Sequence, residues 1–247
     1  MSNFRLAVSF LTVLPLYGKR TAREKDMARS LYYYFLVGFL IGGILFAAAH
    51  LTTRLKLGMA GDVLLVVLWV ILTGGLHLDG LMDSADGIFS GRDRNQKLEI
   101  MKDSRVGAMG AIALLVIFMT KVSFLNIIAY PMKNWTLLCA PALGRAVMVY
   151  PIVFFPYARK EAGLGRAFGS RPGKLAFPLG LIITMTAGFF LAGAPMLLGM
   201  TAAVFSAAAL AAGISKILGG HTGDTYGALC EICEALFIVS IAIVQGL

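Results

Sequence analysis

Long runs of apolar residues alternate with short polar stretches along this chain. A helix needs roughly 20 apolar residues to cross the hydrocarbon core of a bilayer. Runs that reach or approach this length lie at 31–51, 59–78, 106–130, 135–157, 175–193, 195–214 and 226–246. The pattern predicts an all-α fold, a polytopic membrane helix bundle with six to seven transmembrane helices in one integral membrane domain, 1–247. The shorter stretch at 4–17 predicts a re-entrant or interfacial helix.

The composition supports a membrane protein. Hydrophobic residues make up 58% of the 247 residues and charged residues only 14%, whereas a soluble domain has about 25% charged residues. This excludes an ordinary soluble domain and a disordered chain. Glycines at close spacing, such as Gly38 and Gly42, allow helix backbones to approach closely. The three cysteines lie in apolar runs and predict no disulfide framework.

The basic residues are distributed unevenly between the polar segments. When the segments are assigned alternately to two sides, 16 of the 22 Lys and Arg residues fall on one side and 3 on the other. The positive-inside rule makes the first side cytoplasmic. We therefore expect cytoplasmic segments near 79–105, 158–174 and 215–235. The net charge of +9 then indicates contact with lipid head groups and no nucleic acid.

Three aspartates follow the second apolar run, in GGLHLDGLMDSADG. Spacings of four and three residues place Asp79, Asp83 and Asp86 on one face of a helix. Aligned carboxylates repel one another unless a cation lies between them, and Mg²⁺ prefers such oxygen ligands. The sequence therefore predicts a Mg²⁺ site. The alternative is a solvated helix face whose carboxylates pair with the basic residues that follow.

A second group of charged residues follows in LEIMKDSRVG, with Glu99, Asp103 and Arg105. A further carboxylate pair and an Arg suit a metal-bound phosphate, because Arg binds phosphate oxygens bidentately. The alternative is an ordinary surface pattern, and for Glu99 alone that interpretation is favoured.

A third group lies in GGHTGDTYGALCEICEA, where Asp224, Glu231 and Glu234 share one helix face inside an apolar run. Carboxylates there are unsuited to facing lipid, so they predict either a site role or pairing inside the bundle with Arg145. Arg145 lies midway along an apolar segment and needs either such a carboxylate or a substrate phosphate. Lys121 has a longer stem that allows it to snorkel toward the membrane surface.

The polar stretch PYARKEAGLGRAFGSRPGK is basic and rich in glycine. Its Arg159, Lys160, Arg166 and Arg171 predict contact with lipid head groups or, more specifically, with a substrate phosphate. The histidines are scattered, and His77, two residues before Asp79, is the best candidate for a histidine ligand.

The string GGLHLDGLMDSADGIFSGRDRNQKLEIMKDSRVGAMG at 74–110 resembles the signature of the cobalamin 5′-phosphate synthase family, also called adenosylcobinamide-GDP ribazoletransferases. Similar strings follow the family's order along the chain: FLTVLP (10–15), VGFLIGG (37–43), LGRA (143–146), PYARKEAGLGRAF (156–168) and GGHTGDTYGALCEICEA (219–235). Leu78 is a departure, since some members carry a Glu before the aspartate. If that Glu contributes to a metal site elsewhere, this chain has one carboxylate fewer.

The resemblance implies a multi-pass, Mg²⁺-dependent enzyme of the bacterial or archaeal cytoplasmic (inner) membrane that completes cobalamin, with its active site facing the cytoplasm. Such an enzyme joins adenosylcobinamide-GDP to α-ribazole or its 5′-phosphate and releases GMP. Its partners would be these substrates and membrane lipid. The sequence is also compatible with a homo-oligomer. The site residues predicted for this reaction are Asp79, Asp83 and Asp86 on Mg²⁺, Asp103 as fourth ligand or base, Arg105 and Arg145 on phosphate, Arg159 on substrate, and Asp224 and Glu231 as second-tier metal or nucleoside contacts.

Two other functions remain as alternatives. Another Mg²⁺-dependent membrane transferase, of the phosphatidyl or prenyl type, would use similar chemistry, and only the long signature string separates it from this family. A transporter would more often place its carboxylates midway along broken helices in paired halves. The main aspartate group here lies at a predicted cytoplasmic boundary instead.

Overall fold

The structure is a computed structural model that describes residues 2–18, 23–159 and 173–246. In these residues the regular elements are helices, with one isolated β-bridge between Tyr157 and His221. The elements are α1 (Ser2–Leu11), α2 (Glu24–Ser30), the 3₁₀ turn η1 (Leu31–Tyr33), α3 (Tyr34–Arg54), α4 (Met59–Thr73), α5 (Leu76–Ile88), α6 (Arg94–Ile100), α7 (Ala108–Ile127), α8 (Met132–Phe154), α9 (Ala176–Leu218) and α10 (Gly223–Gly246). Among them, five spans are long and apolar enough to cross a membrane, or six if the bent pair α4 and α5 forms one span. The predicted all-α membrane bundle is confirmed.

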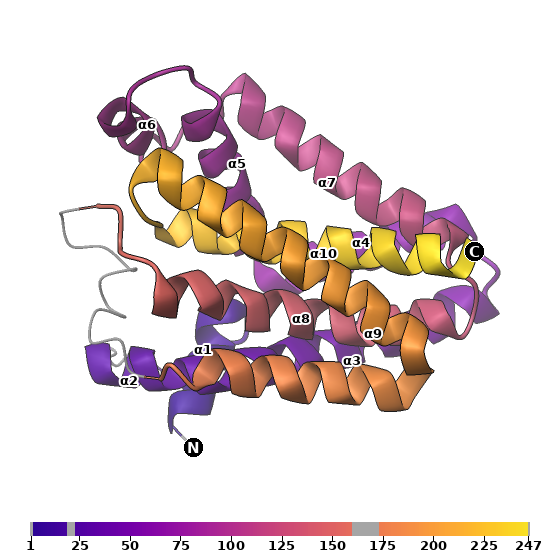
Figure 1. Cartoon of the computed structure of the whole chain (residues 1–247). Coiled ribbons are helices and arrows are strands. Elements are labelled where there is room, and N and C mark those ends of the chain that lie inside the picture. The colour runs from indigo at the N-terminus through magenta and orange to yellow at the C-terminus, as the bar shows by residue number, and fades with distance from the viewer. Residues whose placement is uncertain (1, 19–22, 160–172, 247) are drawn as a thin grey trace.

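The helix ends gather at opposite ends of the bundle. Figure 1 shows α2, α6 and the beginning of α10 at one end of the molecule. The connections from α3 to α4 and from α7 to α8 lie at the other end, together with the C-terminal end of α10. Consecutive apolar helices therefore run in alternate directions, as a multi-pass protein requires.

The predicted span 59–78 is wrong at its C-terminal end. Helix α4 ends at Thr73, and the chain turns through 92° before α5 begins. Gly74 (φ 61°) and Gly75 (φ 71°) form this turn in the left-handed region, which glycine adopts without steric cost. With 13 residues, α5 is about 20 Å long and carries three aspartates, and it forms a short helix of its own after α4.

The predicted segments 175–193 and 195–214 correspond to the two arms of α9. The helix is interrupted at Ala192 (φ −144°, ψ 15°) and Gly193 (φ 70°, ψ −155°), and Pro195 follows. Figure 1 shows that the arms on either side of this point run in opposite directions. The second arm continues to Leu218 and so carries the chain back to the end where α10 begins.

Helix α8 lies at the centre of the bundle and is mostly buried. Helix α3 packs on it through glycines: a Cβ at Gly38 would overlap the backbone of Ala142, and one at Gly42 would overlap that of Leu138. The close approach predicted from the glycine spacing is thus confirmed. The predicted N-terminal helix is α1, a short element that buries Leu6, Ala7, Val8 and Leu11 against the bundle.

Candidate active site

Helix α5 carries the three predicted aspartates to the beginning of α10. The two helices touch at Gly80, where a Cβ would lie 2.7 Å from the carbonyl oxygen of Asp224. Glycine at this position therefore allows the α5 backbone to lie directly on α10. Asp224 joins Asp79, Asp83 and Asp86 as a result, and we call these four residues the aspartate cluster.

The charges of the cluster are only partly compensated. Partial burial, followed by the charges of Asp79 and Asp224, raises the pKa of Asp83 to about 6. Asp86 raises this pKa further, whereas Arg159 lowers it. Among the described residues, neither Asp79 nor Asp83 accepts a hydrogen bond. Their oxygens are available to a cation or a substrate.

Asp86 differs from the other members because it caps α7. Its carboxylate accepts hydrogen bonds from the backbone N–H groups of Gly107 (2.7 Å) and Gly110 (2.8 Å). These groups have no partner within the helix, so the carboxylate satisfies them and faces the positive end of the helix dipole. A Cβ at Gly110 would lie 2.5 Å from Asp86 Oδ2, so the arrangement depends on glycine there.

Arg159 forms an ion pair with Asp224. Its Nη2 donates to Asp224 Oδ2 (2.8 Å) and to the carbonyl oxygen of Met101 (3.3 Å). The hydroxyl of Thr222 donates to the same carboxylate oxygen at 3.1 Å. Arg159 therefore stands beside the cluster, as expected of a substrate contact. The basic residues predicted after it, Lys160, Arg166 and Arg171, lie outside the described residues.

Asp103 and Arg105 pair with each other on the loop before α7. Arg105 Nη2 lies 2.6 Å from Asp103 Oδ2, and its Nε lies 3.0 Å from Oδ1. These hydrogen bonds lower the pKa of Asp103 to about 2. The Arg105 side chain is 87% exposed. Neither residue contacts the aspartate cluster here. Glu99 pairs with Lys102 on the surface of α6, as the alternative interpretation proposed.

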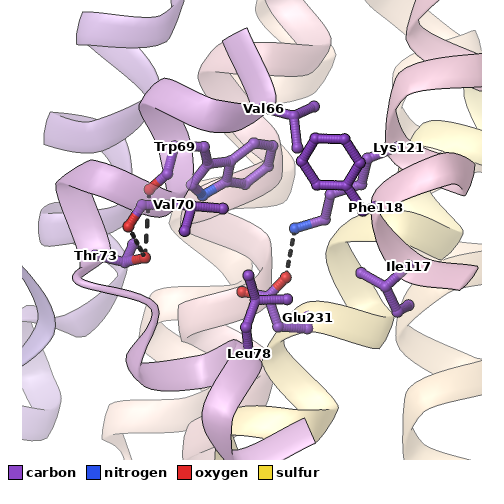
Figure 2. Close-up of a pocket in the computed structure, with 9 residues that line it drawn as sticks. All are labelled: Val66, Trp69, Val70, Thr73, Leu78, Ile117, Phe118, Lys121 and Glu231. Carbon is purple, nitrogen blue, oxygen red and sulfur yellow. Dashed lines mark hydrogen bonds and ion pairs between the residues drawn. The ribbon is translucent and has the colours of Figure 1, made fainter. Parts of the chain in front are cut away.

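Glu231 and Glu234 lie apart from Asp224, in the interior of the bundle. Lys121 Nζ lies 2.6 Å from Glu231 Oε2 and 2.6 Å from Glu234 Oε2. Figure 2 shows Lys121 pointing at Glu231, with the ring of Trp69 beside it, and Nζ is 4.1 Å from the centroid of that ring. The expectation that Lys121 snorkels is wrong, because these carboxylates hold its ammonium inside the bundle.

Arg145 completes this buried network. Its Nη1 donates to Glu234 Oε1 (2.5 Å) and to the carbonyl oxygen of Pro141 (3.1 Å), and its Nη2 lies 3.5 Å from His77 Nδ1. Arg145 is fully buried and has no surface on which to bind a substrate phosphate. Two cations and two carboxylates balance inside the bundle. Of the two alternatives for Glu231 and Arg145, a site role or pairing inside the bundle, the structure shows pairing. The sequence did not indicate that Lys121 also belongs to this network.

The aspartate cluster offers carboxylate oxygens, which are the type of ligand that Mg²⁺ binds. No three His, Cys, Asp or Glu side chains in the described part of the chain converge closely enough to hold a metal ion together. The hard carboxylate oxygens of Asp79 and Asp83, which accept no hydrogen bond from described residues, are nevertheless the ligands that Mg²⁺ prefers, and this ion usually completes its shell with water. The residues therefore fit a Mg²⁺ held by few protein ligands.

Comparison with known proteins identifies the family. A sequence model of the family described as cobalamin-5-phosphate synthase matches residues 3–242. The chain belongs to this family. Three relatives are named adenosylcobinamide-GDP ribazoletransferase. The protein of Desulforamulus reducens is 46% identical over 99% of this chain and 97% of its own length. The protein of Herpetosiphon aurantiacus is 42% identical over 96% of this chain and 94% of its own length. The protein of Roseiflexus sp. is 41% identical over 96% of this chain and 88% of its own length. No solved structure matches the chain.

In this member of the cobalamin-5-phosphate synthase family, Leu78 is a buried residue of α5. It packs in an apolar cluster that includes Ile117 and Ala228. In Figure 2 it lines the same small pocket as Glu231 and Lys121. A carboxylate at position 78 would therefore lie next to the buried network, while Leu78 also lines a second pocket together with Asp79.

Proposed function

We propose that this protein is an adenosylcobinamide-GDP ribazoletransferase. In this proposal it transfers adenosylcobinamide phosphate from adenosylcobinamide-GDP to α-ribazole, or to its 5′-phosphate, and releases GMP. The family and the names of the relatives support this activity. The observation that carries the location of the site is the aspartate cluster itself, with its raised Asp83 pKa and Arg159 beside it.

The reaction exchanges the phosphoanhydride bond of the diphosphate for a phosphate ester bond. A ribose hydroxyl oxygen of the acceptor attacks the cobinamide-linked phosphorus, and the bond from that phosphorus to the bridging oxygen of GMP breaks. The hydroxyl proton passes to a carboxylate base, and GMP leaves with the bond electrons. The products are the cobinamide–ribazole phosphodiester and GMP, so atoms and charges balance.

Asp79 and Asp83 would hold Mg²⁺. Asp86, on the same helix, would support them while its carboxylate caps the start of α7. Bound there, the ion would neutralise diphosphate oxygens and so favour loss of GMP. Arg159 would bind a phosphate oxygen through its guanidinium group, which stands beside the cluster and donates to Asp224 through Nη2. Arg105 is exposed, so it would exchange Asp103 for a substrate phosphate and release Asp103 as a ligand or base.

We place the enzyme in the bacterial or archaeal cytoplasmic membrane with its site facing the cytoplasm. The 16 to 3 distribution of basic residues supports this orientation. The lipid contacts would be made by exposed apolar side chains such as Phe190 (81% exposed) and Phe205 (73% exposed) on α9. The soluble nucleotide substrate would then reach the cluster from the cytoplasm.

The test is release of GMP by purified protein in nanodiscs given Mg²⁺, adenosylcobinamide-GDP and α-ribazole. We expect GMP to appear only when both substrates are present. Asp83→Asn should reduce the rate strongly. Asp93→Asn is the matched control, because Asp93 caps α6 away from the cluster and Asn also caps helices. Absence of GMP with substrates proven active would refute the activity, and full activity of Asp83→Asn would refute the site.

A further inference from the structure

A cavity lies next to the aspartate cluster, between α5 and the neighbouring helices of the bundle. It has a volume of about 180 Å³ and is lined by residues of α1, α3, α5, α8 and α10, among them Phe10, Tyr34, His77, Asp79, Met148 and Tyr226. Asp79 and Asp224 both border it, so it opens directly onto the cluster. Most of the remaining lining is aromatic or aliphatic.

Two buried polar groups in this lining are poorly satisfied. Tyr34 is fully buried and His77 is 2% exposed, yet His77 Nε2 makes no hydrogen bond with any described residue. Tyr34 Oη makes no hydrogen bond of good geometry, although the Ser30 side chain, which donates to Met27, lies near it. The Nδ1 atom of His77 faces Arg145 Nη2, which is only a donor, so Nδ1 accepts and Nε2 carries the hydrogen. Both orphaned groups can therefore donate. Buried donors without an acceptor are costly and rare, which indicates that a ligand supplies the acceptor.

The lining restricts the chemistry of that ligand. Arg145 is already balanced by Glu234, and carboxylates border the cavity, so an anionic group would be repelled. The apolar walls favour a neutral ring, and a cavity of roughly 150 Å³ is enough for benzene. A flat nitrogen heteroaromatic offers apolar faces together with an in-plane nitrogen that accepts a hydrogen bond. A lipid acyl chain would fill the space but leave both donors without an acceptor.

We propose that this cavity binds the heteroaromatic base of the acceptor nucleoside. Resting on the proposed function, the inference assigns the benzimidazole ring of α-ribazole to the cavity. The single lone pair of its in-plane nitrogen would accept a hydrogen bond shared by the donors of Tyr34 and His77. The ribose then points toward Asp79 and Asp224. This places the attacking hydroxyl beside the aspartate cluster and makes Tyr34 and His77 specificity residues for the base.

Direct binding tests this subsite without relying on catalysis. Binding of α-ribazole to the wild-type protein in nanodiscs, without adenosylcobinamide-GDP, is compared by calorimetry with that of the indole analogue, which has C–H in place of the in-plane nitrogen. We expect the analogue to bind about tenfold more weakly, as loss of one or two hydrogen bonds implies. Tyr34→Phe should weaken α-ribazole binding several-fold, leave analogue binding unchanged, and raise the KM for α-ribazole with little effect on kcat.

Tyr33→Phe is the matched control, because the Tyr33 ring packs on Phe4 and Tyr33 does not line the cavity. It should bind both nucleosides as the wild type does. Equal affinity of the wild type for the two nucleosides would overturn the inference, as would unchanged binding in Tyr34→Phe. If GMP release persists in that case, the transferase assignment stands. If α-ribazole binds as expected but no GMP is released, the subsite stands and the proposed reaction fails.

Discussion

Gly80 of α5 lies against the main chain of Asp224 of α10, so closely that a Cβ would stand 2.7 Å from the Asp224 carbonyl oxygen and 2.9 Å from its Cα. We predict that Gly80→Ala pushes α5 away from α10 and separates the aspartates of the two helices. GMP release should fall by about tenfold or more, because catalytic groups displaced by about 1 Å lose much of their effect. Gly43→Ala is the control, since nothing lies within 4 Å of its Cβ position. Equal activity in the two variants would contradict this role for Gly80.

The raised pKa of Asp83 predicts that the stability of the folded protein depends on pH. Its pKa of about 6 in the folded protein exceeds the value of about 3.9 expected in the unfolded chain. The folded state therefore binds more protons between these values, and the metal-free protein should lose stability as the pH rises through 6. Asp83→Asn should raise the midpoint of thermal unfolding at pH 8 and have little effect at pH 4. Mg²⁺ should stabilise the wild type more than the variant. Equal midpoints at pH 8 would contradict a cost of holding the Asp83 charge partly buried beside the other aspartates.

Substitution of Arg105 should lower the activity of the protein without changing its stability. Its side chain is almost fully exposed and pairs only with Asp103 among the described residues, so removing it should leave thermal unfolding unchanged. If it binds a substrate phosphate, Arg105→Ala should lower kcat/KM by about tenfold or more, and Arg105→Lys should recover only part of the loss. Arg92→Ala, at another exposed arginine, is the control. Wild-type kinetics for Arg105→Ala would exclude the proposed contact.

The buried network predicts the opposite pattern. Lys121→Met leaves Glu231 and Glu234 with a single cation, Arg145, and should cost about 3–5 kcal/mol of stability. Removing Glu231 as well, by Glu231→Gln, leaves the neutral pair of Arg145 and Glu234 and should restore part of the loss. Thermal unfolding of the single and double variants in the same detergent measures this coupling. A double variant less stable than Lys121→Met would contradict the charge balance.

Much of the fold follows from the sequence because length and apolarity alone decide where a helix can cross a membrane. The two arms of α9 were predictable for this reason, as was the shared face of Asp79, Asp83 and Asp86. The 92° turn after α4 was missed because an apolar stretch continues past Thr73, although Gly74 and Gly75 carry the signal for a break.

The partners within the site were harder to predict. Lys121 and Glu231 are 110 residues apart, and an isolated lysine in an apolar run gives no indication of which carboxylate it meets. Tyr34 carries no sequence signal either, since it belongs to an aromatic run at the start of α3 and only tertiary packing places it opposite His77. Asp224 was grouped with Glu231 by helical spacing, yet α5 and Arg159 draw it into the aspartate cluster.

We propose that the aspartate cluster is the Mg²⁺-dependent site of ribazole transfer. The rate of GMP release as Mg²⁺ is returned to protein stripped with EDTA, for the wild type and for Asp79→Asn, tests this proposal. We expect no GMP without Mg²⁺, full recovery in the wild type, and a much higher Mg²⁺ requirement in Asp79→Asn. GMP release at the full rate in EDTA, or identical Mg²⁺ curves for the two proteins, would contradict it.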